Sequence, residues 1–223
     1  MQSVPFQKYK SFAKVNRKCI VCLKKTQSTI WASDKYFKAL KCKVCSTVYL
    51  NPVLTEKGLN SYYSQNSIRR SKNKNKNKLR KIQYSQDKHL IETFIKRGKV
   101  LDMGCENGNF LKILNNSFQK YGFDIDTSIS KNINNFAQLE KGDFFKINYN
   151  NNFFDLIIFR GVIEHLSNPK DYINKCYNIL KKNGLIFFCA TPNVDCVTAS
   201  HYRNKWNLWH PIQNINLFSS KTI

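Results

Sequence analysis

Acidic residues are scarce in this chain, whose 223 residues include 14 Asp and Glu against 37 Lys and Arg, a net charge of +23. The imbalance lies in residues 1–100, which hold 24 basic and 4 acidic residues, whereas residues 101–223 hold 13 and 10. A basic segment of this kind can bind a phosphate backbone or an acidic surface. Compositional bias is the alternative, because the tract Lys72–Lys78 alternates Lys with Asn and carries no aromatic residue that could stack on bases.

Long apolar runs are also lacking. No stretch approaches the roughly 20 apolar residues of a membrane-spanning helix, and residues 1–18 lack the apolar core of a signal peptide. We therefore expect a cytoplasmic protein. A chain of this length can bury one sizeable core, with a small module beside it.

Eight cysteines are present, and four of them form two Cys-x-x-Cys pairs: Cys19 with Cys22, and Cys42 with Cys45. The pairs are 19 residues apart, a spacing that brings four thiolates around one tetrahedral ion and predicts a structural Zn²⁺ site. A closed four-thiolate site leaves no coordination position for substrate, and a module this small needs its metal to fold. Chance pairing or a redox dithiol is the alternative.

The segment Val100–Gly108 is typical of a buried strand that enters a glycine turn and opens a helix. Gly104 and Gly108 allow the backbone to approach a ligand closely, and Asp102 places a carboxylate at the end of the strand. The spacing Asp-x-Gly-x-x-x-Gly differs from the dinucleotide-binding Gly-x-Gly-x-x-Gly, and Glu106 would repel a pyrophosphate. A cofactor with a positive centre and no phosphate fits this turn better than a dinucleotide does, although an ordinary tight turn is the alternative.

This segment resembles motif I of the class I S-adenosylmethionine (SAM) dependent methyltransferases, whose loop wraps the methionine part of the cofactor. The front segment is similar to the zinc ribbon that precedes the methyltransferase domain in one subgroup of that class. There a cysteine knuckle runs into a strand, an Asn-Pro and a Tyr-Tyr pair, as it does here at Asn51-Pro52 and Tyr62-Tyr63. The subgroup is often associated with the modification of sugars and polysaccharides.

An acid stands where a ribose-binding carboxylate is expected. Tyr121–Asp124 is typical of a second strand that ends in a carboxylate, and in doubly wound folds such a group accepts hydrogen bonds from the ribose hydroxyls. Asp124 is the candidate, with Asp126 as a substitute, while helix capping is the alternative role. The resemblance implies a cofactor site with these members: Asp102, Gly104, Cys105, Gly108, Asp124, Ile125, Asp143, Phe144 and Arg160. In it, Asp143 accepts from the adenine amino group and Phe144 packs on the ring.

The segment Arg160–Leu166 resembles a family segment that commonly carries Glu-His-Leu. Two subgroups use Glu-x-x-Glu-His there to bind a metal ion, but Gly161 replaces the first Glu, so we do not expect a catalytic metal. His165 is the candidate general base, because an imidazole with an ordinary pKa near 6.5 suits that task. The alternative is that Glu164 and His165 line the cofactor pocket or cap a helix. Later in the chain, Gln213 and Asn214 stand where the family usually has Glu and His.

Alternating strands and helices after residue 85 predict an α/β fold, a doubly wound and mostly parallel Rossmann-like sheet. We expect a zinc-ribbon module at 1–65, a basic linker at 66–84 and a SAM-binding domain at 85–223. The chain stops where the class I fold would add a helix and a strand hairpin, so we expect a shortened domain with a bare fifth strand. The aromatic tail from Val194 onward is interpreted either as a substrate lid or as a cover for the core.

The sequence thus predicts methyl transfer from SAM to a small-molecule acceptor, a sugar or nucleotide-sugar. An RNA methyltransferase is the first alternative, favoured by the basic front half and the ribbon. A non-catalytic, zinc-stabilised interaction protein is the second, favoured by the abrupt end of the chain.

Overall fold

The computed structural model describes residues 14–24, 27–55, 57–59, 74–126 and 131–223, and the chain divides into two compact units. The sheet unit comprises residues 72–163 and 170–191. The ribbon unit comprises residues 1–71, 164–169 and 192–223. We expected the tail after residue 191 to belong to the cofactor-binding domain, whereas it folds with the front module.

The sheet unit contains five parallel strands in the order β10-β9-β6-β7-β8. The strands are β6 (Gly98–Met103), β7 (Phe118–Asp124), β8 (Gln138–Lys141), β9 (Phe154–Arg160) and β10 (Leu180–Cys189). The strand order reverses at β6, so the chain leaves this central strand toward β7 and β8 and later returns on its other side to β9 and β10. This topology confirms the expected Rossmann-like fold.

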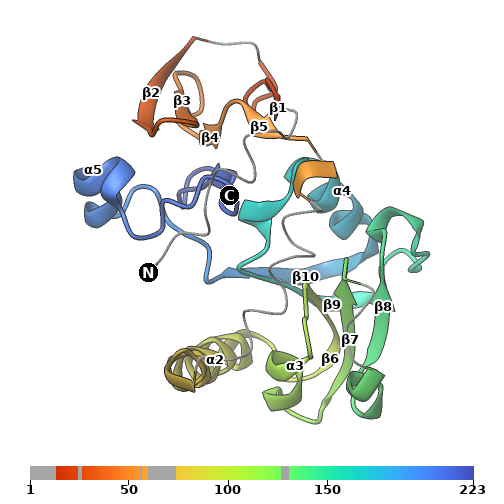
Figure 1. Ribbon diagram of the computed structural model, residues 1–223. Helices are drawn as coiled ribbons and strands as arrows, with labels where there is room; N and C mark the ends of the chain where they lie inside the picture. The colour runs from red at the N-terminus through yellow and green to blue at the C-terminus, as the bar shows by residue number, and fades with distance from the viewer. Residues whose placement is uncertain (1–13, 25–26, 56, 60–73, 127–130) are drawn as a thin grey trace. The chain divides into compact units, whose positions relative to one another are not determined.

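Both faces of the sheet are covered, because the central strands are apolar on both sides. Val100, Leu156 and Ile158 belong to one core cluster, in which they pack with residues of α2 (Lys74–Phe94) and α3 (Asn109–Ile113). Their sequence neighbours Leu101 and Ile157 are also buried and, by the alternation of a strand, face the opposite side. Figure 1 shows α2 and α3 on one face and α4 (Pro169–Ile179) on the other.

Helix α2 is longer than we expected, since it includes residues 74–84, which we assigned to the linker; residues 66–73 lie outside the described part of the chain. Tyr84, Ile91 and Ile95 pack against the core, at spacings of seven and four residues, while Leu90 and Phe94 are exposed. The remaining connections contain the short 3-10 helices η3 (Lys131–Asn135), η4 (Phe144–Lys146) and η5 (Ile163–His165).

The ribbon unit is built on a four-stranded antiparallel sheet in the order β11-β4-β3-β2. These strands are β2 (Ser28–Ser33), β3 (Lys38–Cys42), β4 (Val48–Leu50) and β11 (Asn216–Leu217). Strands β1 (Lys14–Val15) and β5 (Val53–Leu54) form a separate two-stranded sheet. The tail adds the helices α5 (Val197–Tyr202) and η6 (Arg203–Lys205).

The tail aromatic residues supply much of the ribbon unit's core. Trp206 and Trp209 are buried, and each ring centroid lies 6.4 Å from that of Trp31 in β2. Strand β11 pairs with β4, and no strand from residues 194–223 pairs with β10 in the parallel sheet. The buried tryptophans support the second interpretation of the tail, in which it covers a core. That core belongs to the ribbon unit.

None of the helices in the described part of the chain is long and apolar enough to cross a membrane.

Two leucines of the sheet unit provide a test of this packing. Leu101 on the central strand β6 is fully buried, whereas Leu185 on the edge strand β10 is exposed to 39%. We expect Leu101→Ala to lower the free energy of unfolding by about 3 kcal/mol, and Leu185→Ala to lower it by under about 1 kcal/mol, because only the first leaves a closed cavity. Urea denaturation measures both values, and equal losses would contradict the assigned core.

Candidate functional site

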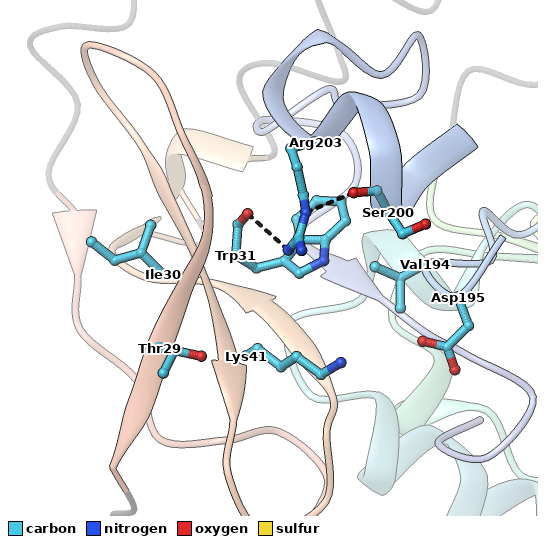
Figure 2. Close-up of a pocket in the computed structure, with 8 residues that line it drawn as sticks. All are labelled: Thr29, Ile30, Trp31, Lys41, Val194, Asp195, Ser200 and Arg203. Carbon is cyan, nitrogen blue, oxygen red and sulfur yellow. Dashed lines mark hydrogen bonds between the residues drawn. The ribbon is translucent and has the colours of Figure 1, made fainter. Parts of the chain in front are cut away.

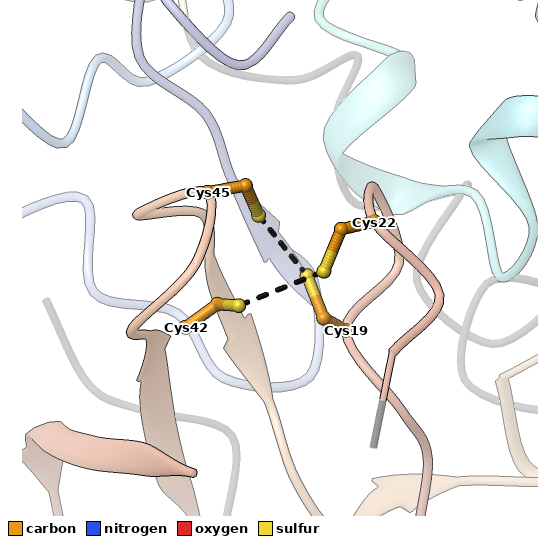
Figure 3. Close-up of side chains that lie close together, drawn as sticks. All are labelled: Cys19, Cys22, Cys42 and Cys45. Atoms are coloured by element: carbon orange, nitrogen blue, oxygen red, sulfur yellow. Dashed lines mark hydrogen bonds between the residues drawn. The ribbon is translucent and has the colours of Figure 1, made fainter. Parts of the chain in front are cut away.

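The four paired cysteines form a cluster in the ribbon unit. Their sulfur atoms all lie within 4.8 Å of one another, with Cys19 Sγ 3.4 Å from Cys45 Sγ and Cys22 Sγ 3.7 Å from Cys42 Sγ (Figure 3). Zinc–sulfur bonds of about 2.3 Å in a tetrahedron place sulfurs about 3.8 Å apart. The cysteines are therefore positioned to bind one metal ion, and a set of four thiolates is consistent with structural Zn²⁺.

The two cysteine pairs sit on turns of the same geometry. Leu23 N–H donates to the carbonyl of Cys19 (3.0 Å), and Ser46 N–H donates to the carbonyl of Cys42 (2.9 Å). Leu23 and Ser46 both adopt left-handed backbone conformations, with φ of 56° and 63°. Each Cys-x-x-Cys segment thus curls back on itself, which aims two sulfurs from each turn at a common centre.

A buried cation accompanies the cluster. Arg17 Nε donates to the carbonyl of Leu50 (2.8 Å) and Nη2 donates to that of Ile215, while Nη1 is out of contact with solvent and has no hydrogen-bond partner among the described residues. Burial lowers the pKa of Arg17 to about 10, an effect opposed by Tyr49 and Cys19. Since Zn²⁺ with four thiolates carries two negative charges, this guanidinium is a suitable counter-charge.

Burial raises the pKa of Cys19 to about 12. A neutral thiol binds metal poorly, so an ion here must displace the proton of Cys19 as it binds.

The sheet unit contains a second candidate site at the carboxyl ends of its strands. After β6 the chain passes through Gly104, Glu106 and Gly108, all with positive φ (71°, 48° and 68°), before α3 begins. A Cβ on Gly104 would lie 2.6 Å from Val162 Cγ2, so a side chain is excluded by space as well as by backbone conformation. The structure confirms the expected order of a strand, a glycine turn and a helix.

Asp124 joins this glycine turn to the end of β7. Its Oδ2 accepts from Glu106 N–H and its Oδ1 accepts from Asp126 N–H, both at 2.9 Å. Each carboxylate oxygen has a further lone pair, so Asp124 can still accept hydrogen bonds from two ligand hydroxyls. Burial raises the pKa of Asp124, while the two N–H donors lower it.

Three acids surround the turn. Asp102, at the penultimate position of β6, is almost completely buried, and burial raises its pKa to about 8; Arg160 opposes the shift, and Asp124 and Glu106 add to it. Like charges that repel one another across a small site favour a cationic ligand, because a cation relieves the repulsion.

Arg160 is held by residues of α2 that sequence reasoning did not identify. Its Nε donates to Asp87 Oδ2 (3.0 Å), and its guanidinium carbon lies 4.2 Å from the ring centroid of Tyr84. Its Nη2 is buried without a hydrogen-bond partner in the described part of the chain. Helix α2 also supplies Arg80, 3.4 Å from Glu106. No local sequence pattern indicates which turn of α2 lies beside Arg160.

The remaining expected members differ in burial and in hydrogen bonding. Asp143 accepts from Phe145 N–H (3.0 Å) and so caps η4, and Phe144 is fully buried, stacked on Tyr172 with ring centroids 5.5 Å apart. A buried ring does not offer its face to an adenine, whereas the next residue, Phe145, is 47% exposed. Ile125 is exposed after β7, and Cys105 is buried with its pKa raised by burial.

The candidate base His165 lies in the ribbon unit. Its Nδ1 is 2.5 Å from the carbonyl oxygen of Gln213, which can only accept, so Nδ1 carries the proton and Nε2 is the basic nitrogen. Nε2 lies 3.9 Å from Glu164 Oε1. The cofactor candidates lie in the other unit, and the role of His165 as a general base stays a prediction.

Comparison with known proteins connects the chain to an enzyme family. A family model described as a methyltransferase domain matches residues 58–223. No curated protein matches the chain.

Solved structures resemble part of it. A protein from Pyrococcus horikoshii is 24% identical, with a TM-score of 0.44 over 48% of this chain and 57% of its own. A protein from Bacillus halodurans is 18% identical, with a TM-score of 0.49; the match covers 60% of this chain and 62% of that protein. A SAM-dependent methyltransferase from Thermotoga maritima is 18% identical, with a TM-score of 0.49; the match covers 75% of this chain and 73% of that protein. The chain thus spans less than two thirds of the length of the first two.

The metal site can be tested with one substitution and a matched control. We expect the purified protein to contain about one Zn²⁺ per chain, measured by atomic absorption, and Cys19→Ser to lose it together with cooperative unfolding of the ribbon unit. Cys196→Ser, which changes a partly buried cysteine outside the cluster, should keep the metal. Full zinc content in Cys19→Ser would contradict the assigned ligand set.

The burial of Asp102 predicts a pH dependence. In the unfolded chain its carboxyl group ionises near pH 3.9, whereas in the folded protein its pKa is about 8. Between these values only the unfolded state is ionised, so this group's contribution to stability falls as pH rises and levels off above about pH 8. Asp102→Asn removes the effect.

The measurement is urea denaturation of the ligand-free protein from pH 4.5 to 8.5. Relative to wild type, Asp102→Asn should gain a few kcal/mol of stability across that range, at ~1.4 kcal/mol per pKa unit. Asp126→Asn is the control, and a difference between Asp102→Asn and wild type that does not change with pH would contradict the raised pKa.

Proposed function

The chain belongs to the methyltransferase domain family, and on this premise we propose that it transfers a methyl group from SAM to a small-molecule acceptor, a sugar or nucleotide-sugar. The observation that carries the proposal is the arrangement at the carboxyl ends of β6 and β7. There the glycine turn, Asp124 and two further acidic side chains, Asp102 and Glu106, meet at one edge of the sheet.

SAM fits the groups that are present. Asp124 retains lone pairs for the two ribose hydroxyls, and it is joined to the left-handed turn at Gly104–Gly108 through Glu106 N–H. The orphaned Nη2 of Arg160 is a buried donor that suits an anionic or carbonyl oxygen, such as one of the methionine carboxylate. Phe145 is the exposed ring available to the adenine, in the place where we expected Phe144.

Charge supports the same cofactor. SAM carries a sulfonium and an ammonium group, and Asp124 and Glu106 present carboxylates at the turn. Asp102, whose pKa burial raises to about 8, ionises more readily beside a cation. A phosphate-bearing cofactor in the same position would add to the repulsion among these acids.

When bound, SAM supplies a methyl group that its positive sulfur has already activated for nucleophilic attack. The protein's own part is to hold the donor and acceptor in line and to exclude water. Asp124, Arg160 and Phe145 would hold SAM, which would supply the methyl group, and a hydroxyl acceptor would give its proton to a base. His165 Nε2 is the candidate base for a hydroxyl acceptor.

The acceptor class rests on the resemblance of the front module to the zinc ribbons of sugar-modifying methyltransferases. The basic front half favours RNA as the alternative acceptor. Binding to RNA that weakens steeply as the salt concentration rises would favour an RNA acceptor. Absence of RNA binding at low salt would exclude an RNA acceptor.

Titration of SAM by calorimetry tests cofactor binding. We expect wild type to bind SAM and Asp124→Asn to bind it at least 10-fold more weakly, because an amide offers one acceptor oxygen where two are needed. Asp126→Asn should bind normally, since the Asp126 interaction that supports Asp124 comes from its backbone N–H.

Thermal unfolding of each variant shows whether Asp124→Asn remains folded, because Asp124 also holds Glu106 N–H. Unchanged SAM affinity in a folded Asp124→Asn variant would contradict the assigned site, and no binding by wild type would contradict the function.

A further inference from the structure

Helix α2 provides the contacts that hold Arg160 at the edge of the candidate cofactor site. Arg160 is the last residue of β9, which pairs with β6, the strand that enters the glycine turn. The segment after Arg160 packs on that turn, because a Cβ on Gly104 would lie 2.6 Å from Val162 Cγ2. Helix α2 belongs to the same unit as these strands, so the contacts lie within one compact body.

Two residues of α2 fix the Arg160 side chain. Its Nε donates to Asp87 Oδ2 at 3.0 Å, in an ion pair whose Arg and Asp side chains are 12% and 21% exposed. Tyr84 lies three residues before Asp87, on the same face of the helix, and its ring centroid is 4.2 Å from the guanidinium carbon. An ion pair on one edge and a ring against the face restrict where the guanidinium can turn.

This arrangement leaves one donor of Arg160 open. Its Nη2 is out of contact with solvent and has no hydrogen-bond partner in the described part of the chain. Buried donors are nearly always satisfied, so an open one at the carboxyl end of a strand suits a ligand oxygen.

An acid nearer the glycine turn competes for the same guanidinium. Arg160 lies close enough to Asp102 to oppose the rise of its pKa, yet the ion pair of Arg160 among the described residues is with Asp87. Without Asp87, the guanidinium could turn toward Asp102, which would withdraw Nη2 from a ligand. The contact with α2 therefore keeps a cation beside the site without neutralising an acid of the turn.

We propose that Asp87 and Tyr84 are positioning residues, which hold Arg160 so that its Nη2 donates to the carboxylate of bound SAM. Both residues act through Arg160 and need no contact with the cofactor. The inference rests on the proposed function, because it assigns two further residues to the same cofactor site. Tyr84 falls in the segment that we expected to be a linker, so this role is one that the sequence did not indicate.

The test compares two ligands that differ in the carboxylate. S-Adenosylhomocysteine (SAH) carries the amino acid part of the cofactor, whereas 5′-methylthioadenosine has the same adenosine and thioether without it. In calorimetric titrations of the full chain, we expect Asp87→Asn to weaken SAH binding by about 10-fold or more, as for loss of a charge-assisted hydrogen bond. Binding of 5′-methylthioadenosine should stay nearly unchanged, because its contacts do not involve Arg160.

Tyr84 provides a second pair of variants. Tyr84→Leu should weaken SAH binding selectively, in the same way as Asp87→Asn, because it removes the ring from the guanidinium. The conservative Tyr84→Phe keeps the ring and should rescue SAH binding. If Asp87→Asn does not fold, this pair carries the test.

Glu92→Gln is the matched control. Glu92 is another acid of α2 with a side chain exposed to a similar extent, 24%, but its partners are Lys88 and Asn115 N–H. Its loss should leave the affinities for both ligands unchanged, and thermal unfolding shows whether each variant remains folded.

A double substitution separates positioning from a general loss of structure. In an Arg160→Met background, Asp87→Asn should cause no further loss of SAH affinity, whereas independent structural effects would add.

Unchanged SAH affinity in a folded Asp87→Asn variant, or equal losses for SAH and 5′-methylthioadenosine, would overturn the inference. It would also fail if wild type bound SAH no more tightly than 5′-methylthioadenosine, and cofactor binding would then still stand. If wild type binds neither these ligands nor SAM, the proposed function fails and this inference fails with it.

Discussion

The hydrogen bond from Glu106 N–H to the Asp124 carboxylate is the contact on which the candidate cofactor site depends. It joins the glycine turn after β6 to the end of β7, two strands that are already neighbours through parallel pairing. Glu106 has a positive φ, and its N–H donates to the carboxylate at the end of β7. The turn, the buried Asp102 and the ribose-binding candidate are thereby brought to one edge of the sheet, where a cation is favoured.

A different constraint organises the ribbon unit. Its strands are short, and its sulfur cluster lies on two turns of matching geometry. Arg17 connects this cluster to the tail, because its guanidinium donates to Leu50 in β4 and to Ile215 just before β11. A four-thiolate Zn²⁺ site, with its two negative charges, and the buried Arg17 cation complement each other in charge. The tail completes both the sheet and its tryptophan core. The tail also returns to β2, where Arg203 Nη1 donates to the carbonyl of Trp31 (Figure 2).

Much of the candidate site was predictable because its signals are local. Cys-x-x-Cys spacing, glycines at positive φ and apolar runs that end in an acid each concern a few consecutive residues. Phe144 shows the limit of such reasoning. Two consecutive phenylalanines follow Asp143, and only packing against Tyr172 decides that Phe144 enters the core and leaves Phe145 exposed. The partners of Arg160 were equally out of reach, since Asp87 lies 73 residues earlier on α2.

The sequence by itself determined the two kinds of module, the four metal-binding cysteines, and the order of strands and helices around a glycine turn. Tertiary structure alone decided that the tail folds with the ribbon and that His165 and the cofactor candidates belong to different units. The physical reason is the range of the interactions. Turns and strands follow from neighbouring residues, whereas the pairing of β11 with β4 and the packing of Trp206 on Trp31 join segments about 170 residues apart, which no local pattern encodes.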